Sequence, residues 1–348
     1  FRHFLHQPRG AHRFLITRMD SLDFRLINEF QRDFPLDEQP FAEIAWRLCA
    51  DEETVLAALQ RLREEGVVSR VGAVFAPRRV GASTLAALAA PPDRLEEIAA
   101  RVSARPEVNH NYEREHRYNL WFVVTACNEA HLASTLEAIE RDTGCEVISL
   151  PLEHEFYIDL GFDLAGVCKA PCSTRRIEAG DLRELTLPEQ KLMGALQHGL
   201  DLVPRPFARL GEQASLDEQE VIATLKRWRG EGLIKRFGVV VRHHELGYTA
   251  NAMVVWDLPD DEVERVGGLL AAEPEVTLCY QRRRHLPEWP YNLFCMIHGR
   301  ARGEVEAAAA RLRERLGLTQ VPHAMLFSRR RFKQRGAHYI PQAATAHG

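Results

Sequence analysis

The chain has 348 residues, of which 45% are hydrophobic, and this is enough apolar material for two or three buried cores. A formal net charge of −4 excludes a general attraction to nucleic acid or anionic lipid, so any anion-binding site has to be local. The sequence contains no run of eighteen apolar residues, so no membrane span is expected. Its seven cysteines have no regular spacing, which favours reduced thiols in a cytoplasmic protein.

The chain contains the same unit twice. Four spaced residues recur after a constant offset of 166 positions, namely Gln31, Pro40, Gly66 and Gly81 as Gln197, Pro206, Gly232 and Gly247. A shared offset over four positions indicates an internal duplication, and such a duplication fixes the architecture of the chain. We therefore expect one architecture repeated, with the two copies packed as a pseudo-dimer within the chain.

Each copy opens with three predicted helices. The helices of the first copy are expected near residues 22–30, 40–45 and 51–63, and Gly66 ends the third. Residues 67–75 follow as a strand pair or wing. The second copy repeats this order at 192–196, at Pro206-Phe207 and at 217–229, then at Gly232 and 233–241. The pattern is typical of a winged helix-turn-helix.

A βαββαβ pattern, the ferredoxin-like arrangement, follows in each copy. The first copy has expected strands at 83–90, 108–114, 119–126 and 146–156 and helices at 92–103 and 129–142. The second has expected strands at 249–257, 276–282, 292–299 and 320–327 and helices at 260–272 and 302–316. The predicted fold class is therefore α+β, a tandem repeat of winged helix-turn-helix and ferredoxin-like domains.

These elements predict seven segments along the chain. They are an N-terminal extension (1–18), winged helix 1 (19–80), ferredoxin-like domain 1 (81–165), a linker (166–184), winged helix 2 (185–245), ferredoxin-like domain 2 (246–340) and a tail (341–348).

This order of domains resembles the Lrp/AsnC transcription regulators. In a helix-turn-helix the third helix presents its first residues to bases and phosphates, so cations or hydrogen-bond donors are expected there. Here that helix begins with Asp51, Glu52 and Glu53 in one copy and with Asp217 and Glu218 in the other. Carboxylates oppose phosphate, and acids in a first turn also stabilise any helix by about 0.3–1 kcal/mol. Both interpretations predict no specific DNA binding.

The segments between the second and third strands of each ferredoxin-like domain are rich in Tyr, Arg and His. The first reads HNYEREHRYNLWFVV over residues 110–124, and the second reads CYQRRRHLPEWPYNLFCMIHG over residues 279–299. Aligned on Tyr-x-Arg, Tyr112 and Arg114 correspond to Tyr280 and Arg282. The second copy carries five additional residues before the shared Tyr-Asn-Leu-aromatic motif.

These residue types suit a large ligand with several carboxylates. Arginine binds carboxylates through two parallel hydrogen bonds, and histidine supplies a metal ligand or a proton donor near neutral pH. Each motif alone is more often solvated or ion-paired than functional. The same unusual mixture at the same place in both copies favours a functional site. We interpret His154, His298 and His323 as ordinary strand histidines.

The two segments resemble the signature segments of the sirohaem decarboxylases, which include the AhbA/AhbB pairs and the Nir D, L, G and H proteins. The tandem arrangement is similar to a fusion of Nir D and Nir L. This resemblance implies that the Lrp-like scaffold is an enzyme, a carboxy-lyase. Its activity would remove carbon dioxide from two acetate side chains of sirohaem to give 12,18-didecarboxysirohaem, in haem d1 or alternative haem synthesis.

The resemblance and the residue chemistry together suggest roles for twelve residues. The expected catalytic residues are His116, His110, His285 and Tyr112, with His116 also a candidate axial ligand to the iron of the substrate. The expected substrate-binding residues are Arg114, Arg117, Tyr280, Arg282, Arg283, Arg284, Trp121 and Trp289.

No cofactor is expected beyond the iron of the tetrapyrrole. Expected partners are the sirohaem substrate and other Nir-type subunits, and a homodimer is also compatible with the sequence. Two alternatives stay open, a ligand-responsive DNA-binding regulator and a haem sensor without catalysis. The sequence leaves open which half is catalytic and which histidine meets the iron, because His116 aligns with Arg284 and His285 is displaced by one position.

Overall fold

A computed structural model of the chain describes residues 21–76, 80–158, 185–241 and 250–336. The predicted N-terminal extension (1–18), the predicted linker (166–184) and the predicted tail (341–348) lie outside the described residues. None of the described helices is long and apolar enough to cross a bilayer.

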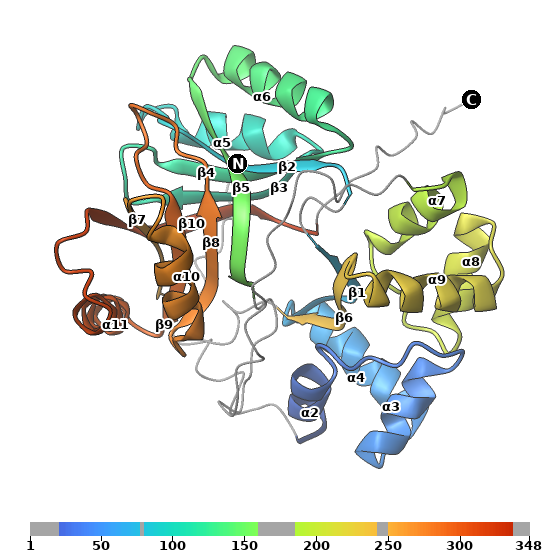
Figure 1. The fold of residues 1–348 in the computed structure, drawn as a ribbon. Coiled ribbons are helices and arrows are strands. Elements are labelled where there is room, and N and C mark those ends of the chain that lie inside the picture. Colours follow the sequence, from blue (N-terminus) through green and yellow to red (C-terminus); the bar gives the residue numbers. More distant parts are fainter. Residues whose placement is uncertain (1–20, 77–79, 159–184, 242–249, 337–348) are drawn as a thin grey trace, which may run out of the picture. The chain divides into compact units, whose positions relative to one another are not determined.

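The described elements follow the predicted order (Figure 1). In the first repeat they are α2 (Ser21–Glu29), α3 (Pro40–Leu48), α4 (Glu52–Glu64), β1 (Val68–Phe75), β2 (Ala82–Leu88), α5 (Leu95–Ala104), β3 (Val108–Arg114), β4 (Leu120–Ala126), α6 (Glu129–Thr143) and β5 (Val147–Ile158). In the second they are α7 (Leu187–Leu196), α8 (Pro206–Ala214), α9 (Glu218–Gly230), β6 (Ile234–Val241), β7 (Ala250–Trp256), α10 (Val263–Ala272), β8 (Val276–Arg282), β9 (Leu293–Gly299), α11 (Arg302–Arg315) and β10 (His323–Gln334).

The described residues form two compact units that each combine parts of both repeats. One unit contains 21–74 and 198–241, and the other contains 75–158, 185–197 and 250–336. The first is therefore built from the helix-turn-helix segments of both repeats, and the second mainly from the two ferredoxin-like segments.

In the helix-turn-helix unit, α3 packs on α4 and α8 packs on α9. The turn within each pair contains a residue in the left-handed conformation, Cys49 with φ 54° and Ser215 with φ 60°. Strands β1 and β6, one from each repeat, form a two-stranded sheet. The expected strand pair within each wing is thus replaced, among the described residues, by pairing between the repeats.

The other unit contains a closed eight-stranded barrel with the order β10-β3-β4-β2-β5-β8-β9-β7. Within each repeat the first strand lies between the third and fourth, which is the order of a ferredoxin-like sheet. The repeats join where β5 pairs with β8 and where β10 pairs with β3, both antiparallel. Closure leaves neither sheet with a free edge.

Strand β10 runs seven residues further than predicted, to Gln334 rather than to residue 327. The segment after Phe327 is basic, and the predicted strand stops before it. In the structure it pairs with β3, where Ser328 lies opposite Arg114 and Gln334 opposite His110. A neighbouring strand edge from the other repeat therefore decides the length of β10.

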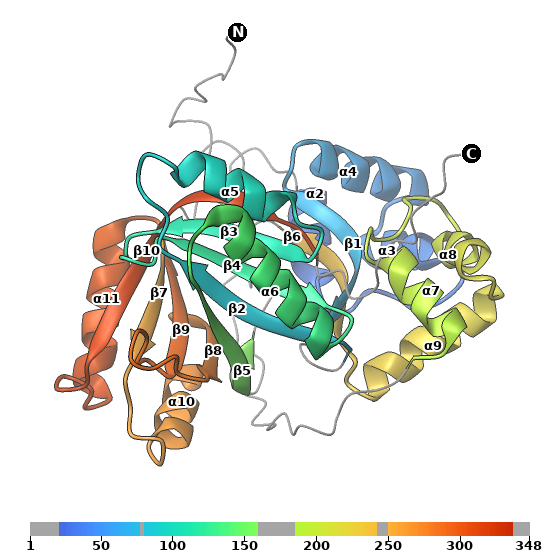
Figure 2. The ribbon, with the colours of Figure 1, turned by 90° about the horizontal axis from the view of Figure 1, so that it is seen from above.

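The barrel unit has three buried cores. Helices α5 and α6 cover the outer face of the first sheet, and α10 and α11 cover that of the second (Figures 1 and 2). The third core lies inside the barrel, and it contains side chains from both repeats, for example Trp121, Leu150, Phe294 and Leu326. Side chains alternate between inner and outer faces along each strand. This alternation decides which polar groups reach the interior.

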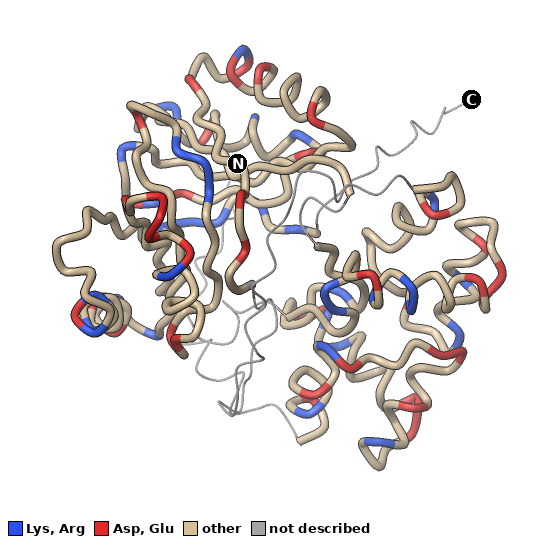
Figure 3. Tube along the Cα trace, viewed as in Figure 1, with Lys and Arg blue, Asp and Glu red and all other residues tan. Residues whose placement is uncertain are grey.

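The acidic starts of the third helices are helix caps. The Asp51 side chain accepts from the Thr54 backbone N–H at 2.7 Å, and Asp217 with Glu220 forms a capping box at α9. Basic residues fall instead in the last turns of α4 and α9 (Figure 3). We therefore expect only weak, non-specific duplex binding, about 10⁻⁴ M or poorer near physiological salt. A footprint on one DNA sequence at nanomolar protein concentration would contradict this expectation.

Candidate active site

The central part of the candidate site is the inner face of β3 and β8. On β3, Asn111 donates to the Ala99 carbonyl of α5 and Glu113 binds Arg330, so these two side chains face outward. Alternation then places His110, Tyr112 and Arg114 on the inner face. On β8 the corresponding inner residues are Tyr280, which belongs to the interior core, and Arg282.

Arg114 and Arg282 occupy equivalent places in the two repeats. Arg114 is 8% exposed, and its Nη1 donates to the Leu326 carbonyl at 3.0 Å. Nη1 of Arg282 donates to the Leu150 carbonyl at 2.8 Å. In each case the carbonyl belongs to the last strand of the other repeat. The two guanidinium groups are thus held by the strand pairs that close the barrel.

Neither guanidinium has a carboxylate partner among the described residues. The acids near Arg114 are engaged elsewhere: Glu113 pairs with Arg330 at 2.6 Å and Glu115 with Arg302 at 2.8 Å. Across the part of the chain that the structure describes, no carboxylate lies within ion-pair distance of Arg114 or Arg282. Burial lowers the pKa of Arg114 to about 10 and also lowers that of Arg282. Buried charge without a partner is costly, so this arrangement favours an anionic ligand.

Two tyrosines accompany the arginines. The Arg114 guanidinium carbon lies 5.8 Å from the centre of the Tyr112 ring, and that of Arg282 lies 4.7 Å from the Tyr280 ring. Burial raises the pKa of Tyr112, so its hydroxyl stays protonated near neutral pH. A protonated phenol donates a hydrogen bond, which suits a carboxylate held by the neighbouring arginine.

His116 lies in the short β3–β4 turn in a defined tautomer. The Tyr118 backbone N–H donates to its Nδ1 at 3.1 Å. Nδ1 is therefore unprotonated, and the neutral ring carries its proton on Nε2. Burial, and then the charge of Arg117, lowers the pKa of His116. In this state the ring is a neutral Nε2–H donor, whereas iron ligation through Nε2 requires the other tautomer.

Trp289 joins the two hairpins through an aromatic cluster. Its side chain is fully buried, and the ring centre lies 4.9 Å from Trp121, 5.4 Å from His116 and 5.0 Å from Tyr291. Trp121 is itself held by a 2.7 Å bond from its Nε1 to the Tyr118 carbonyl. The rings meet edge to face, and residues of both repeats contribute to the cluster.

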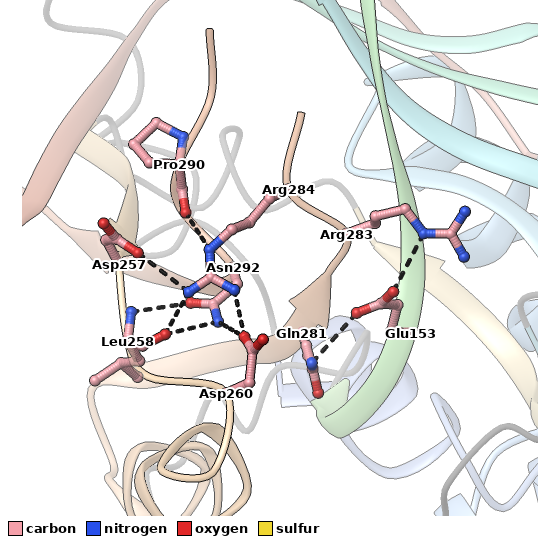
Figure 4. A network of polar contacts seen from close by, with 9 residues as sticks. All are labelled: Glu153, Asp257, Leu258, Asp260, Gln281, Arg283, Arg284, Pro290 and Asn292. Atoms are coloured by element: carbon pink, nitrogen blue, oxygen red, sulfur yellow. Dashed lines mark hydrogen bonds and ion pairs between the residues drawn. The ribbon is translucent and has the colours of Figure 1, made fainter. Parts of the chain in front are cut away.

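Arg284 holds the longer second hairpin in shape (Figure 4). Its guanidinium donates to the Pro290 carbonyl at 2.7 Å and to Asp257 at 3.1 Å, and it also binds Asp260 and the Leu258 carbonyl. The hydrogen bond from Arg284 is the main reason that the pKa of Asp260 is lowered. The stabilisation that ionised Asp260 contributes is therefore fully present above the pKa of this group in the unfolded chain. It is lost as the pH falls through the lowered pKa of Asp260 in the folded protein.

Replacing Arg284 by Met should destabilise the barrel unit by about 1.5–3 kcal/mol, since it removes charge-assisted bonds from a partly buried network. Arg283 is a matched control one residue earlier, because it is 67% exposed and its bond to Glu153 is 3.3 Å long. Replacing Arg283 by Met should change stability by about 0–1 kcal/mol. Urea unfolding of both variants measures the difference, and equal midpoints would remove the structural role of Arg284.

The remaining predicted residues are spread over the hairpins. Arg117 donates to the Glu288 carbonyl at 2.6 Å, which links the hairpins directly. His285 and Trp289 exchange backbone hydrogen bonds at 2.9 and 2.6 Å. The His110 ring lies 6.3 Å from Tyr112. Arg283 and Arg284 have carboxylate partners, whereas Arg114 and Arg282 have none in the part of the chain that the structure describes.

Sequence reasoning passed over His298, which we had interpreted as an ordinary strand histidine. It lies on β9 in step with Phe294 and Met296, both in the interior core, so its ring faces the inside of the barrel. Burial, and then the charge of Arg114, lowers the pKa of His298 to about 4. The alternation of Phe294, Met296 and His298 at every second residue was the available signal, but it needed the knowledge that this face is interior. Among the described residues no His, Cys, Asp and Glu cluster suits a metal ion.

The chain matches two domain families along both repeats. Residues 23–68 and 189–235 match the siroheme decarboxylase NirDL-like HTH domain, and residues 79–157 and 245–333 match the AsnC-like ligand binding domain. The siroheme decarboxylase NirDL subunit of Paracoccus denitrificans is 50% identical over 94% of this chain and 99% of its own length. The chain belongs to the siroheme decarboxylase NirDL family.

Other members of the siroheme decarboxylase family account for the tandem arrangement. In Stutzerimonas stutzeri the NirD subunit is 53% identical over 42% of this chain and 96% of its own length. The NirL subunit of the same organism is 48% identical over 44% of this chain and 91% of its own length. The family thus contains single-unit proteins as well as tandem ones.

Solved structures of siroheme decarboxylase NirDL have the same fold. One is 28% identical, covers 92% of this chain and 95% of its own, and has a TM-score of 0.69. Another, 29% identical with a TM-score of 0.68, covers 91% of this chain and 94% of its own and is a complex with an iron-uroporphyrin III analogue. The α+β tandem of helix-turn-helix and AsnC-like domains is therefore confirmed.

Proposed function

We propose that this protein is a sirohaem decarboxylase that removes carbon dioxide from two acetate side chains to give 12,18-didecarboxysirohaem, in haem d1 or alternative haem synthesis. One observation carries the proposal: Arg114, which is buried, and Arg282, which is half-buried, lie at equivalent places in one barrel and have no carboxylate partner among the described residues. Sirohaem has carboxylates on every ring, and its side chains would supply the missing negative charge.

The reaction needs two things from the protein. The acetate carboxylate has to be held and stripped of water, and a proton has to reach the carbon that carbon dioxide leaves. An arginine orients the carboxylate but also stabilises its charged ground state, so the acceleration comes from positioning and from proton donation. A buried guanidinium together with a nearby imidazole meets both needs.

We assign roles from the surroundings of each side chain. Arg114 and Arg282 anchor carboxylates, and Tyr112 and Tyr280 orient them through their hydroxyls. His116 in its observed tautomer donates a hydrogen bond from Nε2, and ligation of the substrate iron through Nε2 would require the proton to move to Nδ1.

Other predicted residues act at greater distance. His110 and His285 remain candidate second imidazoles, and Trp121 and Trp289 form an apolar wall. Arg117 and Arg283 stay candidates for outer carboxylates. Arg284 has four polar partners of its own, so we assign it to the hairpin rather than to the substrate.

The related proteins support the ligand and the subunit composition. The iron-uroporphyrin III analogue bound by a solved relative is an iron tetrapyrrole rich in carboxylates, and we propose the same ligand class here. No cofactor beyond the substrate iron enters this proposal. Because NirD and NirL exist as separate subunits, we propose that the tandem supplies both functions in one chain, while association with further Nir-type subunits stays open.

The decisive experiment is anaerobic incubation of the purified protein with sirohaem, followed by mass analysis of the tetrapyrrole. Loss of two carbon dioxide units supports the decarboxylase. Tight binding of unchanged sirohaem supports a sensor, and salt-sensitive duplex binding without conversion supports a regulator. Either of the last two outcomes would contradict the proposed function.

A further inference from the structure

We propose that His298 is the catalytic residue that delivers the proton to the acetate carbon, in a composite site whose carboxylate anchor is Arg114 of the other repeat. This inference rests on the proposed function and deepens it. The arginine comes from β3 and the imidazole from β9, so neither repeat contains the complete site by itself.

The strand register places the two side chains in one row of the barrel. Ser328 on β10 lies opposite Arg114, and the preceding residue, Phe327, lies opposite Ala252 on β7. The next β7 residue towards the N-terminus, Asn251, lies opposite His298 on β9. Four neighbouring strands therefore carry Arg114, Ser328, Asn251 and His298 at nearly the same level.

Both side chains point to the interior from this row. Inward side chains of a small closed barrel converge, because the wall curves around them. Arg114 extends a long side chain from its strand and already interacts electrostatically with His298. A carboxylate bound by the Arg114 guanidinium would therefore lie within reach of the imidazole.

The equivalent row around Arg282 has Thr125 rather than an imidazole at the position of His298. There Ser83 lies opposite Thr125 at the positions of Asn251 and His298, and Arg282 lies opposite Leu152. The Thr125 hydroxyl already accepts from the Asn109 side chain at 2.6 Å. A carboxylate anchored by Arg282 has no imidazole at the corresponding place. The duplication thus yields two anchors, of which Arg114 shares its row with the imidazole of His298.

Binding of the substrate would itself charge the imidazole. Without substrate, burial and the positive charge of Arg114 favour the neutral ring. A bound carboxylate neutralises Arg114 and adds a negative charge nearby, which favours the imidazolium. The carbon–carbon bond to the carboxylate then breaks and its electron pair stays on the methylene carbon. The imidazolium gives its proton to that carbon, so the products are a methyl group, carbon dioxide and neutral His298.

His116 is less suited to this step. Its Nδ1 accepts the Tyr118 N–H, so protonation of that nitrogen would remove the hydrogen bond. Arg117 also opposes a positive charge on the ring, whereas the structure gives His116 no anchor comparable to Arg114. We therefore assign His116 to hydrogen bonding and His298 to proton delivery.

The test replaces His298 by Gln, which keeps a polar side chain of similar size but cannot donate a proton as an acid. His323→Gln is the matched control, because His323 lies on a barrel strand but stacks on Trp256 of the helix-covered core, at 5.4 Å. Decarboxylation of sirohaem, binding of iron-uroporphyrin III and the absorption spectrum of the bound iron are measured for all three proteins. Circular dichroism confirms folding.

We expect His298→Gln to lower kcat by about 10²-fold or more, the range for losing a general acid, with binding and the iron spectrum unchanged. His323→Gln should behave like the unaltered protein. If His298→Gln is fully active and the unaltered protein is active too, this inference is overturned while the proposed function stands. Lost analogue binding or an altered iron spectrum also overturns it, because His298 would then be a binding residue or an iron ligand. If the unaltered protein releases no carbon dioxide, the proposed function fails and the inference falls with it.

Discussion

Replacing Arg114 and Arg282 together by Met should weaken binding of iron-uroporphyrin III by more than about 10²-fold, because each hydrogen bond to a charged partner contributes about 1.5–3 kcal/mol when desolvated. The same variant should lose little stability without ligand. Removing one buried and one half-buried charge, neither with a carboxylate partner among the described residues, offsets the loss of the hydrogen bonds to the Leu326 and Leu150 carbonyls. Absorbance titration and urea unfolding measure the two effects.

A large loss of affinity with little loss of stability is what identifies a ligand-binding arginine. Arg265→Met is a suitable control, because Arg265 is 57% exposed on α10 and pairs with Glu262 of the preceding turn. It should alter neither quantity appreciably. If the double variant unfolds far more readily but binds the analogue normally, both arginines are structural and the anion site lies elsewhere.

Replacing Trp289 by Ala should destabilise the barrel unit by about 3–5 kcal/mol, the usual cost of truncating a buried Trp or Phe. The side chain is fully buried and contacts aromatic rings from both hairpins, including Trp121 at 4.9 Å. The ring lies against His116 as well, so turnover should fall even where the variant remains folded. Thermal or urea unfolding gives the first effect and the sirohaem assay gives the second.

Trp46 provides the matched control for this substitution. Its side chain is 76% exposed on α3, so Trp46→Ala should change stability by no more than about 0.5 kcal/mol. A loss below about 1 kcal/mol for Trp289→Ala would mean that the hairpins do not depend on this ring. The second hairpin would then owe its shape mainly to Arg284.

The sequence was sufficient for the features that depend on local pattern. Helical periodicity and terminal Gly66 and Gly232 predicted the helix-turn-helix segments, and alternation predicted the strands of both ferredoxin-like repeats. The constant offset of 166 residues predicted one architecture used twice. The two Tyr-x-Arg segments predicted the region of the proposed site, because an unusual residue mixture occurred at the same place in both repeats.

The tertiary structure decided which members of that mixture are available to a ligand. Arg282 and Arg284 are two residues apart, yet the first lacks a carboxylate partner among the described residues and the second binds Asp257 and Asp260. Whether an arginine is neutralised depends on acids that other strands and loops bring to it, and sequence spacing does not record this. The contrast therefore became visible only in the folded barrel.

The sequence by itself thus determined the repeat, the order of elements and the segments that carry the chemistry. Only the tertiary structure brought Arg114 to the Leu326 carbonyl and aligned His298 with it across four strands. Barrel closure pairs strands that are distant in the chain, and their register depends on packing of the whole interior rather than on any local signal. The interior position of His298 follows from that closure.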